Sequence, residues 1–124
     1  MIASIVIADE EEDIRYLLTI LLRSYTLYTA TTGEDALALI REHQPDAALL
    51  DVMMPRMSGL EVVAHLKADS CTASIPLILL SAKGQATDIE EGYRAGVQRY
   101  IVKPFDTDEL QKTVAALLQS SIRT

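Results

Sequence analysis

Residues 49–55 read Leu-Leu-Asp-Val-Met-Met-Pro, an apolar run that ends on a single acidic residue, Asp51. A buried strand can carry a polar residue at its end for solubility alone. It can also direct a carboxylate into a crevice, where the group binds an ion or takes part in chemistry. The choice between these interpretations depends on what the rest of the chain places beside Asp51.

The length and composition of the chain are those of one domain. The chain has 124 residues, 49% of them hydrophobic, which suffices for a single core. The longest apolar runs, such as Ile75–Leu80, are far shorter than the roughly 20 residues of a transmembrane helix. The net charge of −7 disfavours direct binding of nucleic acid. One cysteine, Cys71, and a start without a basic leader predict a cytoplasmic protein without a membrane segment.

Short apolar runs alternate with amphipathic stretches along the chain. The apolar runs predict five strands, which are Ser4–Ala8, Leu27–Ala30, Ala47–Leu50, Leu77–Leu80 and Tyr100–Val102. A helical pattern follows each strand. Five such units predict an α/β fold, a doubly wound parallel sheet with helices on both faces and the third and fourth strands at its centre. We assign residues 1–120 to this domain and residues 121–124 to a tail or the start of a linker.

Two helix boundaries are marked by specific signals. Thr31-Thr32-Gly33-Glu34 predicts a capping box ahead of the second helix. The fourth helix is expected from about Asp88 to Ala95, with Gly96 at its C-cap.

Polar side chains follow four of the five predicted strands. The first strand is followed by Asp9 and Glu10, the third by Asp51, the fourth by Ser81 and the fifth by Lys103. Ligands of open parallel sheets bind beyond the carboxyl ends of the strands, so we expect these groups to meet at one edge. The acidic residues at 11–13 are interpreted as an ordinary helix start, where acids suit the helix dipole.

This set of groups suits phosphoryl transfer. Carboxylates of Asp9, Glu10 and Asp51 brought together would repel one another and raise a pKa, and a divalent cation relieves this. Mg²⁺ favours such oxygen ligands. A carboxylate beside Mg²⁺ can attack phosphorus and form an aspartyl phosphate. Lys103 can then balance one phosphoryl oxygen, and the hydroxyl of Ser81 can bind another.

At this point the chain resembles the receiver domain of two-component response regulators over essentially its whole length. Residues 51–61, 75–84 and 99–106 are similar to three signatures of that family. The resemblance implies the flavodoxin-like strand order 2-1-3-4-5, with Asp51 as phosphoacceptor. It implies Mg²⁺ held by Asp9, Glu10, Asp51 and the backbone carbonyl of Met53. It also implies Ser81 as the switch hydroxyl, Tyr100 as the switch aromatic, Lys103 as the phosphate-binding lysine and a cis bond before Pro104.

The resemblance also implies partners. A sensor histidine kinase or phosphotransfer protein would donate the phosphoryl group, and an effector domain or protein would read the face formed by the fourth helix, fifth strand and fifth helix. A phosphorylation-dependent dimer is a further expectation. Gln98-Arg99 stands where the family often has an Asp-Asp pair, and Thr113 stands where a DNA-binding subfamily usually has arginine. Both exchanges disfavour the dimer of that subfamily.

Two other functions are compatible with parts of the pattern. One is a pseudo-receiver that acts only as an interaction module, against which the intact acidic and basic positions argue. The other is a phosphohydrolase with an aspartyl intermediate. Such enzymes usually carry a second acid two residues after the nucleophile, where this chain has Met53. We therefore expect a signalling switch rather than an enzyme.

Overall fold

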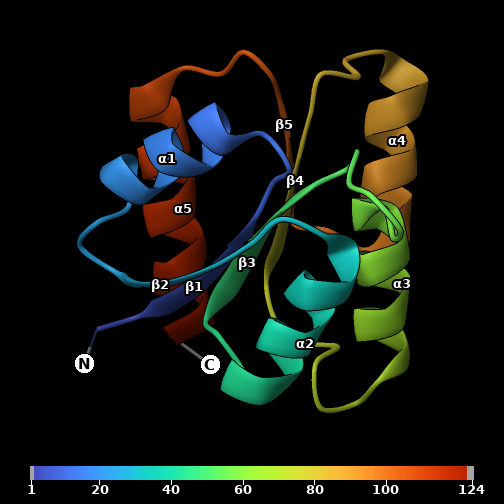
Figure 1. Ribbon diagram of the computed structural model, residues 1–124, viewed down its shortest axis with the longest axis horizontal. Coiled ribbons are helices and arrows are strands. Elements are labelled where there is room, and N and C mark those ends of the chain that lie inside the picture. The colour runs from blue at the N-terminus through green and yellow to red at the C-terminus, as the bar shows by residue number, and fades with distance from the viewer. Residues whose placement is uncertain (1, 123–124) are drawn as a thin grey trace.

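The computed structural model describes residues 2–122 of the chain, with side chains for residues 2–119. Strands and helices alternate along the described residues (Figure 1). The strands are β1 (Ser4–Ala8), β2 (Thr26–Ala30), β3 (Ala47–Asp51), β4 (Leu77–Ser81) and β5 (Arg99–Val102). The helices are α1 (Glu12–Leu21), α2 (Gly33–His43), α3 (Gly59–Ala68), α4 (Ala86–Ala95) and α5 (Thr107–Ile122).

The five strands form one parallel sheet in the order β2-β1-β3-β4-β5, which confirms the expected order. Helices α1 and α5 cover one face, and α2, α3 and α4 cover the other (Figure 1). The order reverses between β1 and β3, so the connections after these two strands diverge to opposite faces. A crevice at such a reversal is where open parallel sheets bind ligands.

Apolar side chains that alternate between the two faces of the sheet build the core. In β1, Ile5 and Ile7 pack under α1 and α5, whereas Val6 and Ala8 pack under α2 and α3. Every residue of β3 and β4 is buried, which confirms their central position. Burial on both faces explains why these strands read as continuous apolar runs rather than as an alternation.

The helix caps correct one prediction. The expected capping box at residues 31–34 is wrong, because the N-cap of α2 is Thr32 and its hydroxyl accepts a hydrogen bond from the Asp35 N–H at 3.1 Å. The reciprocal box occurs at α3 instead, between Ser58 and Glu61. Gly96 ends α4 in the left-handed region with φ 107°, as expected.

Other boundaries differ from the predicted ones by one or two residues. Helix α4 begins at Ala86 rather than Asp88, and strand β5 begins at Arg99. Helix α5 extends to Ile122 and residues 123–124 lie outside the described residues, so the domain boundary at residue 120 stays a prediction. No helix within residues 2–122 combines the length and apolar character needed to cross a membrane.

Candidate functional site

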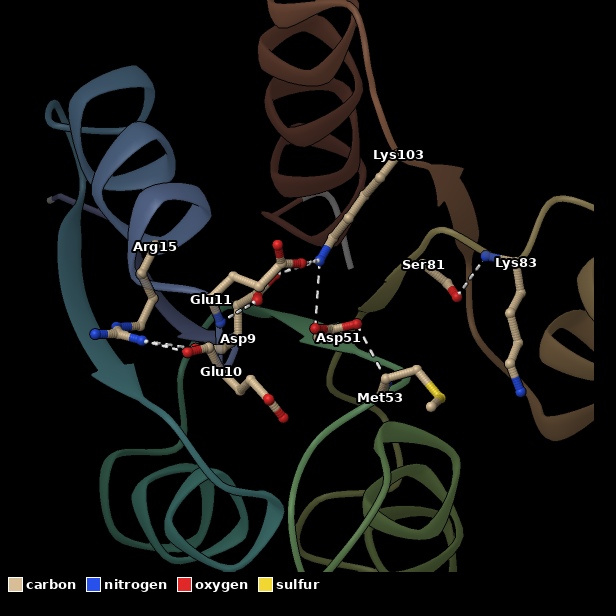
Figure 2. A network of polar contacts seen from close by, with 9 residues as sticks. All are labelled: Asp9, Glu10, Glu11, Arg15, Asp51, Met53, Ser81, Lys83 and Lys103. Carbon is tan, nitrogen blue, oxygen red and sulfur yellow. Dashed lines mark hydrogen bonds and ion pairs between the residues drawn. The ribbon is translucent and has the colours of Figure 1, made fainter.

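The carboxyl ends of the strands bring the predicted polar residues to one edge of the sheet. Asp9 directly follows β1, Asp51 is the last residue of β3, Ser81 is the last residue of β4, and Lys103 directly follows β5. Figure 2 shows Asp9, Asp51 and Lys103 converging on one point, with Ser81 beyond Asp51. The convergence expected from the sequence is thus what the structure shows.

The ammonium group of Lys103 is the centre of this cluster. Its Nζ lies 2.7 Å from Asp9 Oδ2, 3.1 Å from Glu11 Oε1 and 3.3 Å from Asp51 Oδ2. Burial alone would lower the pKa of Lys103, but the hydrogen bonds to Asp9 and Glu11 and the charge of Asp51 raise it above its ordinary value. The side chain is therefore held as a cation in a largely buried place.

The surroundings of Asp51 disfavour the charged form of its carboxyl group. Burial and then the negative charge of Asp9 raise the pKa of Asp51 from 3.8 to about 6, against the opposing effect of Lys103. The Met53 N–H donates to Asp51 Oδ1 at 3.1 Å, which fixes the orientation of the carboxylate. Three carboxylates, those of Asp9, Glu11 and Asp51, share one ammonium, so the cluster is short of positive charge and favours an additional cation.

The loop after β1 is held in place from two sides. Asp9 Oδ1 accepts a hydrogen bond from the Glu11 N–H at 2.9 Å. The guanidinium of Arg15, from α1, donates to the backbone oxygens of Asp9 at 3.0 Å and Glu10 at 3.3 Å (Figure 2). Sequence reasoning missed Arg15, because nothing in the sequence distinguishes an arginine that binds loop carbonyls from one on a solvated helix surface.

Sequence reasoning also missed Glu11. Among the described residues, Asp9, Glu11 and Asp51 form the group whose carboxylate oxygens lie within 4.8 Å of one another. Glu10 is exposed and lies outside that group, so its assignment as a metal ligand stays a prediction, as does that of the Met53 carbonyl. The signal for Glu11 is structural: it is the extended residue before α1, with φ −78° and ψ 117°.

A second set of contacts leads from Ser81 away from the acidic group. Ser81 Oγ accepts from the Lys83 N–H at 3.0 Å, and the Tyr100 hydroxyl donates to the Lys83 backbone oxygen at 2.8 Å. The Tyr100 N–H in turn donates to the hydroxyl of Tyr93, on α4, at 3.1 Å. Residue 83 thus joins the strand end of β4 to the aromatic ring on β5. The Lys103-Pro104 bond is cis, as the resemblance implied.

Gly92 provides the space in which the ring of Tyr100 lies. A Cβ on Gly92 would lie 2.6 Å from Cδ2 of Tyr100, so only glycine permits this half-buried position of the ring. The phenol therefore lies under α4 with its hydroxyl directed to the loop after β4.

Gly59, the first residue of α3, controls how closely that helix approaches the backbone of Asp51. An added Cβ would lie 2.3 Å from the Asp51 backbone oxygen, so we expect Gly59→Ala to lower the free energy of unfolding by about 2 kcal/mol. Urea denaturation measures this change. A variant as stable as the wild type would mean that α3 can shift from β3 without cost.

The donor set fits a hard divalent cation. Asp9 and Asp51 supply carboxylate oxygens, and the group that they form with Glu11 contains neither sulfur nor imidazole. Mg²⁺ and Ca²⁺ take oxygen ligands, whereas thiolate and imidazole favour zinc and copper. The raised pKa of Asp51 adds a physical reason, because a cation at this position relieves carboxylate repulsion.

Comparison with known proteins identifies the family. Residues 5–115 match the response regulator receiver domain, and the chain belongs to this family. Protein PilH of Pseudomonas aeruginosa is 36% identical over 118 residues, covering 94% of this chain and 98% of PilH. The DNA-binding response regulator MtrA of Mycobacterium tuberculosis is 38% identical over 117 residues, covering 93% of this chain.

Solved structures agree with this assignment. The receiver domain of the Francisella response regulator 1452 superposes with a TM-score of 0.90 at 27% identity, covering 96% of this chain and 98% of that one. The chain spans nearly the whole of PilH but only 50% of MtrA. It is a receiver domain of two-component signal transduction, a family in which phosphorylation is the standard signal.

Proposed function

We propose that Asp51 accepts a phosphoryl group, in an Mg²⁺-dependent reaction, from a sensor histidine kinase or a phosphotransfer protein. The observation that carries the proposal is the position of Lys103, whose ammonium lies 2.7 Å from Asp9 and 3.3 Å from Asp51. These three residues are far apart in the sequence and come from three strand ends. Such a fixed cation beside a carboxylate pair is the arrangement that phosphoryl transfer to a carboxylate requires.

Each residue of the site has a different role in the transfer of the phosphoryl group. A carboxylate oxygen of Asp51 forms a bond to phosphorus while the bond from phosphorus to the donor imidazole breaks, and the imidazole nitrogen takes up a proton. Lys103 neutralises a phosphoryl oxygen. Asp9, Asp51, Glu10 and the Met53 carbonyl would hold Mg²⁺, which supplies charge neutralisation at the oxygens of the phosphoryl group.

In this proposal, Ser81 couples phosphorylation of Asp51 to a change in the face of the protein that binds partners. Its Oγ already accepts a hydrogen bond from the Lys83 N–H, so its own hydrogen is free to be donated to a phosphoryl oxygen. A shift of Ser81 toward Asp51 would move residue 83, and with it the carbonyl that binds the Tyr100 hydroxyl. We propose that this changes the face formed by α4, β5 and α5, which then binds an effector or a second copy of the chain.

In this proposal, residues 1–120 form a switch domain that acts in the cytoplasm. The domain assists its own phosphorylation and dephosphorylation, and it does not act as an enzyme on other substrates. Its partners are a phosphodonor protein and a downstream effector, and the charge of −7 supports a protein partner over nucleic acid.

Incubation with Mg²⁺ and acetyl phosphate, followed by intact mass spectrometry, tests the proposal. We expect the mass gain of one phosphoryl group, absent in Asp51→Asn and present in the control Asp35→Asn, which changes an exposed aspartate. Removal of Mg²⁺ with a chelator should abolish the gain. No gain in the wild type would favour a pseudo-receiver, and sustained release of phosphate from a phosphate ester would favour a hydrolase.

A further inference from the structure

Glu11 makes a contact that its position in the sequence does not require. It is the N-cap residue of α1, yet its side chain caps no helix N–H. A residue at this position normally satisfies one of the free N–H groups of the first turn. The carboxylate of Glu11 instead reaches across the site to Nζ of Lys103, 3.1 Å away (Figure 2).

The contact fills the hydrogen-bonding capacity of Lys103. An ammonium group has three hydrogens to donate. Here three carboxylates accept from Nζ, those of Asp9, Glu11 and Asp51. Phosphorylation converts the Asp51 carboxylate into an acyl phosphate, and the anionic oxygens of the new phosphoryl group then compete with the remaining carboxylates for the hydrogens of Lys103.

Exposure decides which carboxylate gives way to a phosphoryl oxygen. The side chain of Asp9 is 0% exposed and that of Asp51 is 5% exposed, whereas that of Glu11 is 61% exposed. A buried carboxylate that loses its ammonium has no water to replace it, but the carboxylate of Glu11 is solvated on release. Release of Glu11 therefore has the lowest cost of the three.

The backbone permits this release. The Glu11 N–H stays bound to Asp9 Oδ1 at 2.9 Å, and Arg15 holds the two preceding carbonyls. The side chain of Glu11 can therefore swing into solvent while the loop that carries Asp9 keeps its shape.

We infer that Glu11 is a positioning residue that opposes phosphorylation: in the resting protein its carboxylate occupies the hydrogen bond of Lys103 that a phosphoryl oxygen takes in the phosphorylated one. The inference rests on the proposed function of Asp51 and adds a competitor to it. Loss of the negative charge at residue 11 should favour the phosphorylated state.

Titration with beryllofluoride, an analogue of the phosphoryl group, at saturating Mg²⁺ tests the inference. Two-dimensional amide NMR spectra report the midpoint. We expect Glu11→Gln to bind the analogue about two- to five-fold more tightly than the wild type, the range for one exposed ion pair. The matched control is Glu12→Gln, which removes the same charge from the next residue, also exposed, and should change the midpoint much less.

Salt gives a readout that a merely structural role would not move. Exposed ion pairs are screened as ionic strength rises, so the ratio between Glu11→Gln and the wild type should fall toward one in high salt. An equal or weaker affinity of Glu11→Gln, with the wild type still binding the analogue, would overturn the inference alone. A wild type that binds no beryllofluoride would overturn the proposed function as well.

Discussion

Replacement of Lys103 by methionine should lower the free energy of unfolding of the metal-free protein by about 3 kcal/mol. The substitution keeps much of the volume of the side chain but removes the only ammonium that contacts Asp9 and Asp51 among the described residues. Loss of one partner from a buried ion pair leaves an uncompensated charge, which is among the most destabilising changes known. Urea denaturation near neutral pH, without divalent cations, measures the loss.

Two comparisons separate this effect from a general loss of positive charge. Lys83→Met removes an exposed lysine that lies near the site and should change the stability little. Mg²⁺ should stabilise Lys103→Met more than it stabilises the wild type, because the cation replaces the missing ammonium. Equal destabilisation by the two lysine variants would contradict the central place given to Lys103.

Replacement of Asp51 by asparagine should stabilise the metal-free protein by about 3 kcal/mol near neutral pH. The pKa of Asp51 is raised from 3.8 to about 6 in the folded chain. The folded state therefore binds this proton more tightly than the unfolded state does. The stability that the proton contributes is complete below pH 3.8 and is lost as the pH rises through about 6. Asparagine resembles the protonated form at every pH, so the free energy of unfolding of the variant does not fall in this pH range.

Urea denaturation of both proteins across this pH range gives the test. The difference in free energy of unfolding between Asp51→Asn and the wild type should grow as the pH rises from about 4 to about 6, and then level off. Asp35→Asn, at an exposed position, should give no such trend. A difference that stays constant with pH would mean that Asp51 titrates as an ordinary exposed carboxylate.

Most of the fold could be predicted from the sequence because burial on both faces leaves continuous apolar runs in β3 and β4. The short connections after each run then allow only a parallel sheet with helices on both sides. The strand order itself came from the resemblance and not from the apolar pattern. The predicted capping box of Thr31 and Glu34 does not form, because the N-cap of α2 is Thr32, and the residue three positions after Thr32 is Asp35 rather than glutamate.

The site could be predicted to the level of strand ends and no further. Asp9, Asp51, Ser81 and Lys103 each lie at such an end, where topology fixes the position of the Cα atom. Glu11 lies in the loop after β1, and Arg15 lies in α1. Their side chains reach the site through rotamers that cannot be predicted from the sequence. In the run of five acids at residues 9–13, only the path of the backbone decides which carboxylates turn toward Lys103.

A crystal structure of the protein with Mg²⁺ and beryllofluoride tests most directly the claim that these side chains form one phosphoryl site. The account predicts beryllium bonded to a carboxylate oxygen of Asp51, a cation bound by Asp9 and Asp51, and Nζ of Lys103 in contact with a fluorine atom. The hydroxyl of Ser81 should contact another fluorine, and the carboxylate of Glu11 should have left Lys103. Beryllium on a different carboxylate, or Lys103 without contact to the analogue, would contradict the account.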